Sequence, residues 1–385
     1  MISAPDPTGM AAHLVTADVL DPAQPRQRIW LRAIEQVPRH LFVPVRAFVQ
    51  PQYDEPDHII DRDVDPDVWR RAVYSHTAII TQRDDGAAAL DDTTAYPTSS
   101  LSSPHVVAKM LHLLNVDKHH RVLEIGTGSG WTAALLAWRL GNNQVTTVEI
   151  DDAVAATAEQ NLKAAGYAPT LVVGDGAFGH LGGAPYDRIH VTCGVRDVPH
   201  AWVEQTRPGG SIVLPWMPVP GRWGLQLRLD VLDDGSAVGT FGDDCGFMML
   251  RSQRAAREWA APSDDGVEST TRTDPREVSA ALGGSFALGL AATAPHIVVT
   301  SAENEQGDAW AMRLQDLTGD GWAVVTARTG QDTRVVQSSA RPLWTQLETA
   351  FMEWLRAGRP ERSAYRMLIS PAGQHVRLTQ VRSTT

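Results

Sequence analysis

Three groups of residues have the types and spacing to hold a ligand. The segment VLEIGTGSGW, residues 122–131, closes an apolar run with an acidic residue and then alternates three glycines with small hydroxyl residues. Glycines let a backbone approach a ligand closely. Two later apolar runs, TTVEI and LVVGDG, carry Glu149 and Asp175 at their ends. A carboxylate at the first position can accept both ribose hydroxyls, and one at the second suits an adenine amino group.

The acids also limit the ligand. Glu149 and Asp175 disfavour a phosphorylated dinucleotide, because negative charges repel. They are compatible with a cationic ligand that has no phosphate, such as S-adenosylmethionine. Taken singly, each acid is also a possible N-cap of the helix that follows it.

The elements around these residues alternate between strands and helices. Strand patterns at 121–126 and 144–150 are each followed by a helical pattern, at 131–141 and 152–166. LVVGDG, YDRIHVT and SIVLPW then read as further strands. This alternation predicts right-handed βαβ units and an α/β, doubly wound, mostly parallel sheet.

The flanking regions predict a second domain. Before the sheet we expect a helix and turn at 26–44, a loop at 84–103, and a helix at 103–116 with Ser103 as N-cap. After it, residues 223–241 read as a hairpin, and 341–358 as an amphipathic helix. We therefore predict one domain over 1–252, a linker over 253–273 and a C-terminal α+β domain over 274–385.

Composition excludes several classes of protein. The net charge of −11 argues against general nucleic-acid binding. No apolar run approaches the roughly 18 residues that span a bilayer, so we expect no membrane partner and a cytoplasmic location. Two cysteines are too few for a disulfide framework. Cys193 reads as a small buried residue, and His112, His119 and His120 read as a solvated loop, so we assign no metal site.

Several motifs in order resemble the protein-L-isoaspartate O-methyltransferases. VLEIGTGSGW is similar to that family's first motif, VPRHLFVP to its N-terminal signature, and SSPHVVAKMLHLL to its Ser-x-Pro-His segment. GDGAFG, APYDRIHVTCGVRDVP and QTRPGGSIVLPW follow in the family's order, so the similarity covers roughly residues 26–250. The resemblance implies a Rossmann-like methyltransferase fold, S-adenosylmethionine as cofactor, and methyl transfer to a peptide carboxylate.

The resemblance also assigns residues. Gly126, Thr127, Gly128 and Gly130 would line the methionine part of the cofactor, Glu149 would hold the ribose, and Asp175 with Gly176 would border the adenine. Glu124 and Ile150 complete the predicted cofactor site. Ser102, Ser103 and His105 are the predicted catalytic residues and would face the acceptor carboxylate.

The chain departs from the family's pattern around the acceptor. YPTSSLSSPH replaces a glycine–glutamine turn, DDGAAALDDTTA precedes it as an insertion, and Ala177 stands where a basic residue is usual. The C-terminal extension resembles that of longer methyltransferases associated with graspetide and lanthipeptide maturation. Such relatives methylate an aspartate in a constrained precursor peptide, and the ester cyclises to an aspartimide that can hydrolyse to isoaspartate.

We therefore predict a peptide-aspartate O-methyltransferase that acts on a macrocyclised ribosomal precursor peptide. General isoaspartyl repair, a non-catalytic peptide-binding module and a small-molecule methyltransferase remain alternatives. The arginine-rich end of the chain has two interpretations. The arginines either form a solvent-exposed face or dock an acidic peptide. The arginines are Arg356, Arg359, Arg362, Arg366, Arg377 and Arg382.

Overall fold

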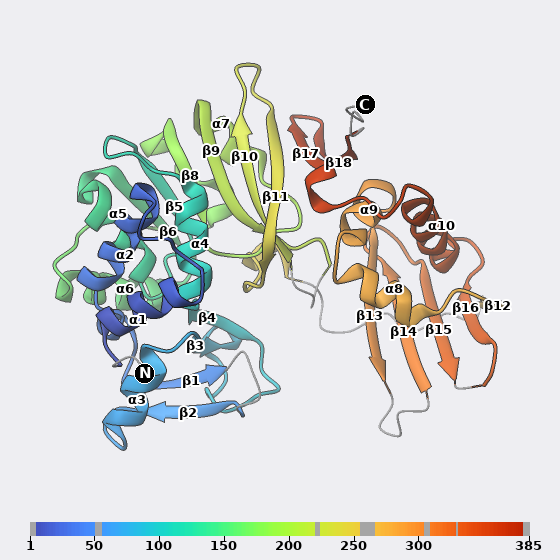
Figure 1. Cartoon of the computed structure of the whole chain (residues 1–385), viewed down its shortest axis with the longest axis horizontal. Helices are drawn as coiled ribbons and strands as arrows, with labels where there is room; N and C mark the ends of the chain where they lie inside the picture. Colours follow the sequence, from blue (N-terminus) through green and yellow to red (C-terminus); the bar gives the residue numbers. More distant parts are fainter. Residues whose placement is uncertain are drawn as a thin grey trace.

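The computed structural model describes residues 5–50, 56–219, 224–254, 266–303, 309–328 and 330–379. Its strands form three sheets, of four, nine and five strands. In Figure 1 the four-stranded sheet lies below the left part of the nine-stranded sheet, and the five-stranded sheet lies on the right. The predicted linker lies partly outside the described residues, as does Arg382.

The nine-stranded sheet is the centre of the fold. Its order is β18-β17-β11-β10-β9-β8-β5-β6-β7. The strands from β9 to β7 run parallel, and the rest pair antiparallel. The parallel strands are β5 (Val122–Ile125), β6 (Val145–Glu149), β7 (Thr170–Val173), β8 (Tyr186–Val191) and β9 (Thr206–Trp216). This is the predicted doubly wound, Rossmann-like arrangement, and β10 (Gly224–Val231) with β11 (Ala237–Cys245) is the predicted hairpin.

Helices cover both faces of the parallel part of this sheet, which explains why its central strands β5 and β8 are buried along almost their whole length. Adjacent residues of β5 point to opposite faces, so Val122 packs into one core and Leu123 into the other. The first core contains residues of α1 (Pro7–Thr16), α2 (Pro25–Gln36), α4 (Pro104–Leu114) and α5 (Trp131–Leu140). The second contains Trp202 of α7 (His200–Glu204).

Two helix starts matter for the site. Asp151 caps α6 (Asp152–Ala164) by accepting hydrogen bonds from the backbone N–H groups of Ala153 and Val154. Ser103 occupies the predicted N-cap position of α4, with Pro104 at the first helical position, but its side chain makes no capping hydrogen bond. The Ser103 hydroxyl is therefore left for another partner.

The four-stranded sheet lies beside the cofactor-binding region and has the order β2-β1-β3-β4. It contains β1 (Arg46–Gln50), β2 (His58–Asp61), β3 (Ala78–Arg83) and β4 (Pro97–Leu101), with α3 (Pro66–Val73) between β2 and β3. The prediction of a loop over 84–103 was wrong for β4. Its residues, PTSSL, are polar, and only pairing with β3 makes them a strand.

The five-stranded sheet belongs to the C-terminal region and has the order β12-β16-β15-β14-β13. Its strands are β12 (Gly266–Thr271), β13 (Ile297–Glu303), β14 (Ala309–Asp316), β15 (Trp322–Arg328) and β16 (Thr333–Ser338). α8 (Pro275–Leu282), α9 (Phe286–Thr293) and α10 (Leu343–Arg356) accompany it. As predicted for the amphipathic helix, Trp344, Leu347 and Phe351 of α10 are buried in this region's core.

Three strands differ from the predicted division of the chain. β12 lies within the predicted linker and pairs with β16. β17 (Tyr365–Ser370) and β18 (Gly373–Leu378) lie within the predicted C-terminal domain, yet β17 pairs with β11 and extends the nine-stranded sheet. The pairing partners lie more than 60 residues away, so the local pattern does not reveal them. None of the described helices is long and apolar enough to cross a bilayer.

Candidate active site

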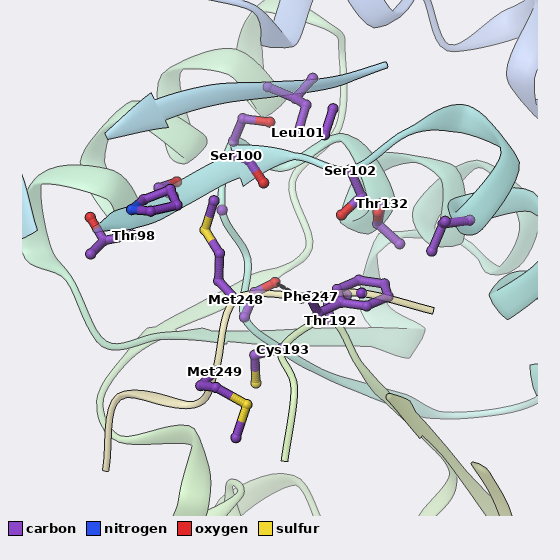
Figure 2. Close-up of a pocket in the computed structure, with 18 of the residues that line it drawn as sticks. Thr98, Ser100, Leu101, Ser102, Thr132, Thr192, Cys193, Phe247, Met248 and Met249 are labelled. Carbon is purple, nitrogen blue, oxygen red and sulfur yellow. Dashed lines mark hydrogen bonds between the residues drawn. The ribbon is translucent and has the colours of Figure 1, made fainter. Parts of the chain in front are cut away.

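A cavity of about 960 Å³ opens at the carboxyl ends of β5 and β6, between the nine-stranded sheet and β4 (Figure 2). Ten of the twelve predicted site residues line it. They are Ser102, Ser103, His105, Gly126, Thr127, Gly128, Glu149, Ile150, Asp175 and Gly176. We call residues 126–128, 149–150 and 175–176 the cofactor wall, and residues 97–105 with 247–251 the acceptor wall.

The glycine turn of the cofactor wall has no room for side chains. Gly126 has a φ of +90°, and a Cβ added there would lie 2.6 Å from the Thr192 Oγ1 atom. Thr192 is not free to move away, because its hydroxyl lies 2.9 Å from the carbonyl oxygen of Ile125 and 2.5 Å from that of Gly126. Glycine is thus required by both conformation and space.

Glu149 ties the second strand of the cofactor wall to this turn. Its Oε2 atom accepts a hydrogen bond from the Gly128 N–H at 2.9 Å, and its Oε1 accepts one from the Asp151 N–H at 3.2 Å. Burial raises the pKa of this carboxyl, although the backbone hydrogen bonds oppose the shift. Glu149 ends β6 and lines the cavity.

Glu124 and Gly130 do not line the cavity, unlike the other predicted residues. Glu124 is fully buried beneath the turn, where its Oε2 accepts a hydrogen bond from the Thr147 hydroxyl at 2.7 Å. The Thr147 oxygen in turn lies 2.6 Å from that of Thr127. Burial raises the pKa of Glu124 to about 8. Glu124 therefore supports the turn from below, and Gly130 starts α5.

Asp175 and Gly176 close the cofactor wall at the end of β7. Asp175 accepts a hydrogen bond from the Ala177 N–H at 2.9 Å, which fixes the start of the turn. The Trp202 indole N–H donates to the Gly176 carbonyl at 2.8 Å from below. Phe178 and Leu181 nearby are 73% and 77% exposed, so this end of the cavity lies close to the surface.

Ser103 is the residue of the acceptor wall that most clearly lacks a partner. It is 3% exposed, and its Oγ atom has no hydrogen-bond partner in the part of the chain that the structure describes. A buried hydroxyl without a partner costs free energy, so such a group in a cavity is a good donor for a ligand. It lies at the N-terminus of α4, where the helix dipole favours an anion.

Arg39 positions the acceptor wall from behind and was not among the predicted site residues. Its guanidinium donates to the carbonyl oxygens of Val73, Thr77 and Ser102 at 2.5, 3.0 and 3.1 Å. The side chain is fully buried, which lowers the pKa of Arg39 to about 9. Its presence in VPRHLFVP was the available signal.

Residues 246–249 form the opposite side of the acceptor wall. Phe247, Met248 and Met249 line the cavity, and Met248 extends toward Ser100 of β4 (Figure 2). The segment is held to the sheet at Gly194, which donates its N–H to the Met248 carbonyl at 2.8 Å. The contact with the sheet is an isolated parallel bridge between Gly194 and Met249 and does not extend into a strand.

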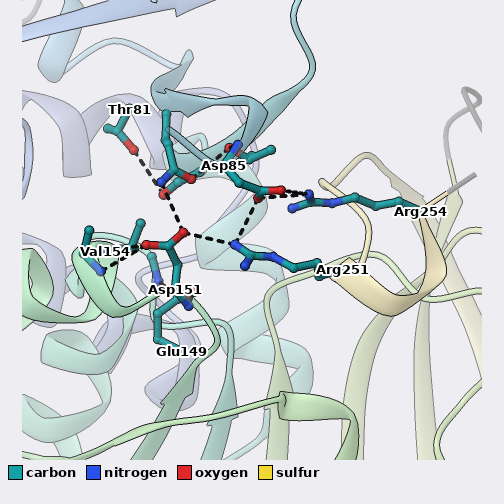
Figure 3. Close-up of polar contacts among 12 residues, drawn as sticks. Thr81, Asp85, Glu149, Asp151, Val154, Arg251 and Arg254 are labelled. Carbon is teal, nitrogen blue, oxygen red and sulfur yellow. Dashed lines mark hydrogen bonds and ion pairs between the residues drawn. The ribbon is translucent and has the colours of Figure 1, made fainter. Parts of the chain in front are cut away.

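Ion pairs connect the insertion to both walls. Arg251 bonds Asp85 at 3.0 Å and Asp151 at 3.1 Å, and Arg254 holds both oxygens of Asp85 at 2.9 and 3.0 Å (Figure 3). Arg254 also lies over the ring of Tyr96. We call Asp85, Asp151, Arg251 and Arg254 the clasp. It joins the inserted segment to the N-cap of α6 at the edge of the cavity.

Cys193 also lines the cavity but is unsuited to nucleophilic chemistry. Burial raises the pKa of its thiol to about 12, with Glu149 and Asp175 adding to the shift, so the thiolate is not formed near neutral pH. The side chain is partly exposed to the cavity, whereas the sequence predicted a small buried residue.

The sequence model of the family described as protein-L-isoaspartate(D-aspartate) O-methyltransferase (PCMT) matches residues 26–254, more than half of the chain. The chain belongs to this family. Membership implies S-adenosylmethionine as the methyl donor, in agreement with the cofactor predicted from the sequence.

Individual relatives agree. A protein-L-isoaspartate O-methyltransferase of Methanopyrus kandleri is 45% identical over 163 residues, which are 41% of this chain and 71% of that protein. One from Methanosarcina mazei is 43% identical over 118 residues, 30% of this chain and 49% of that protein. The chain thus spans about half the length of that relative.

A solved protein-L-isoaspartate O-methyltransferase has the same fold. Its TM-score is 0.53 at 20% identity, and the likeness covers 97% of this chain and 100% of that one. The coverage extends over the C-terminal region.

Proposed function

We propose that this protein is an S-adenosylmethionine-dependent O-methyltransferase that esterifies an aspartyl or isoaspartyl carboxylate of a peptide. One observation carries the proposal. The glycine turn with Glu149 and the unpartnered Ser103 hydroxyl at the N-terminus of α4 open into the same cavity. A donor and an acceptor carboxylate held on these two walls would meet inside it.

The chemistry asks the protein for positioning more than for proton transfer. An aspartyl carboxylate has a reference pKa near 4, so it is ionised at neutral pH and needs no general base. The bound cofactor supplies a methyl group on a positively charged sulfur. The carboxylate oxygen must lie in line with that carbon and sulfur, with water excluded.

The residues divide these tasks. On the cofactor wall, Glu149 would accept the ribose hydroxyls, and the bare turn at Gly126 would admit the methionine part. On the acceptor wall, Ser103 would donate a hydrogen bond to the acceptor carboxylate. Met248 and Phe247 would cover the reacting groups with apolar surface. Ser102 and His105 line the same wall and keep their proposed acceptor-binding roles.

Two measurements on the purified chain test this proposal. Calorimetry with S-adenosylhomocysteine should show binding to one site per chain. Transfer of radiolabelled methyl groups to isoaspartyl or aspartyl peptides should give a base-labile ester. Absence of cofactor binding would favour a non-catalytic peptide-binding module. Methylation of small carboxylic acids alone would favour a small-molecule enzyme.

The finer proposal concerns the acceptor. We propose an aspartate in a macrocyclised ribosomal precursor peptide of the graspetide or lanthipeptide kind, with the ester proceeding to an aspartimide. What supports it is the insertion, which departs from the family pattern where the acceptor must lie and is joined to the cavity's edge through Asp85 and Tyr96. A wall altered at this position fits a dedicated, constrained substrate.

General isoaspartyl repair is the second candidate. It is favoured by the names of the relatives, which are protein-L-isoaspartate O-methyltransferases. A competition assay separates the two. Rapid methylation of short linear isoaspartyl peptides supports repair. Methylation of an aspartate-containing macrocycle, with linear aspartyl and isoaspartyl peptides left unmodified, supports the dedicated role.

A further inference from the structure

Three histidines from separate parts of the chain meet at the acceptor end of the molecule. His13 lies on α1, His76 on the connection between α3 and β3, and His105 in the first turn of α4. Their ring centroids are 3.8 Å apart for His13 and His76, and 4.0 Å apart for His76 and His105. One ligand atom from each ring lies within 4.8 Å of the other two.

We propose that these three imidazoles bind a divalent transition-metal ion of the zinc type. Zn–N bonds of about 2.0–2.1 Å in tetrahedral geometry place the nitrogens about 3.4 Å apart. The ligand atoms lie within 4.8 Å of one another, and binding would require the three rings to rotate out of their present tilted arrangement to reach that value. Three protein ligands leave the fourth position open, as in sites where zinc binds a further molecule.

The local chemistry favours a metal over other partners. The Nδ1 atom of His76 is buried and has no hydrogen-bond partner among the described residues. A ring nitrogen without a hydrogen-bond partner is available to serve as a metal ligand. Among the described residues, no other group of three or more such side chains has this arrangement.

The position of the three histidines beside the acceptor wall suggests a role for the metal in binding the acceptor peptide. This role rests on the proposed methyl transfer. Of the three ligands only His105 lines the cavity, on the acceptor wall and two positions from Ser103. A bound dication would fix His105 against α1 and add positive charge where the acceptor carboxylate is proposed to bind. It should lower the KM for the acceptor peptide and leave the affinity for S-adenosylhomocysteine unchanged.

The test of the site uses Zn²⁺ alone, with the full chain produced without a polyhistidine tag. Competition against a chromogenic chelator should give one Zn²⁺ per chain, and Co²⁺ should give the absorption of a tetrahedral site. His13 is exposed, so His13→Ala removes a ligand with little effect on the fold. Mutating a residue that only hydrogen-bonds to a metal ligand typically lowers metal affinity about 10–100-fold. Loss of a direct ligand should therefore lower the affinity about 100-fold or more.

His76→Ala should have the same effect as His13→Ala, while His119→Ala is the matched control because His119 is exposed and outside the cluster. No saturable binding by the natural chain, or an equal loss in His119→Ala, would overturn the site. Binding without any change in the acceptor KM would overturn its role in substrate binding. These metal titrations need neither cofactor nor peptide, so they stand apart from the test of the proposed function.

Discussion

The two walls of the cavity are built in different ways. The cofactor wall consists of short segments at the ends of β5, β6 and β7, each following directly from a strand. The acceptor wall combines β4, the start of α4 and residues 247–251, which lie far apart in the chain. The buried Arg39 and the clasp hold these pieces together.

This difference teaches where variation is tolerated. A change in the cofactor wall meets fixed neighbours, as at Gly126 against Thr192. A change in the acceptor wall meets partly exposed ion pairs, whose loss costs little. The first wall should therefore set whether the protein binds its cofactor at all, and the second should set how well it accepts one peptide over another.

The largest effect is expected from Gly126→Ala. Both this variant and the control Gly141→Ala carry a Cβ at a φ near +90°, at a cost of about 1–2 kcal/mol. Only at residue 126 does the Cβ meet another group, which adds about 1–3 kcal/mol of overpacking. Denaturant unfolding should show the larger loss for Gly126→Ala, and calorimetry should show loss of S-adenosylhomocysteine binding only there. Equal behaviour of the two variants would contradict the steric argument.

Glu149→Gln should come next. Hydrogen bonds to charged groups contribute about 1.5–3 kcal/mol, so the affinity for S-adenosylhomocysteine should fall about 10–100-fold. Asp152→Asn removes a neighbouring exposed acid and should leave it unchanged. Because the pKa of Glu149 is raised, affinity of the natural chain should weaken on acidification at a higher pH than an ordinary glutamate would give. A pH-independent affinity would argue against an ionised Glu149 in binding.

A smaller, selective effect is expected from Asp85→Asn in the clasp. Asp85 makes two partly exposed ion pairs, which contribute about 0.2–0.5 kcal/mol each, so the acceptor KM should rise about two- to fivefold. Cofactor affinity should not change. Asp91→Asn lies in the same insertion, but its partner Arg46 does not line the cavity, whereas Arg251 and Arg254 do. Steady-state kinetics at low and high salt distinguish Asp85→Asn from Asp91→Asn. A change confined to cofactor affinity would contradict the assignment of the clasp to the acceptor wall.

The smallest effect is expected from Arg362→Glu. The hypothesis of an arginine surface that docks an acidic peptide predicts a steep loss at low salt. In the structure Arg362 already pairs with Asp244 at 2.6 Å, and Arg366 donates to the carbonyl oxygens of Ser363 and Tyr365. We therefore expect peptide affinity to change by no more than about twofold, the range of a surface pair. A large loss, absent from Arg377→Glu, would restore the docking hypothesis.

The cofactor wall was predictable because its signals are local. The apolar runs and the glycine spacing in residues 122–131 placed the strand, turn and helix, and Glu149 followed at the end of the next strand. Glu124 was assigned to the cofactor on its position alone. In the structure Glu124 is buried beneath the turn. Successive side chains of a strand point to opposite faces, and the sequence alone does not show which face Glu124 occupies.

The acceptor wall was only partly predictable. Ser103 and His105 were found through their motif, but β4 was taken for a loop because its polar residues become a strand only beside β3. Arg39, Met248 and the clasp join segments up to about 170 residues apart, as in the bond from Asp85 to Arg254. The same holds for β17 on β11, which the expected domain boundary did not anticipate.

By itself the sequence determined the doubly wound sheet, the glycine turn and the acids at the strand ends, because periodicity and backbone freedom act over a few residues. Only the tertiary structure decided that Ser103 would lack a partner, that Arg251 would bridge two acids, and that three histidines would stack at the acceptor end. Such contacts depend on packing between segments distant in the chain, for which local patterns carry no signal.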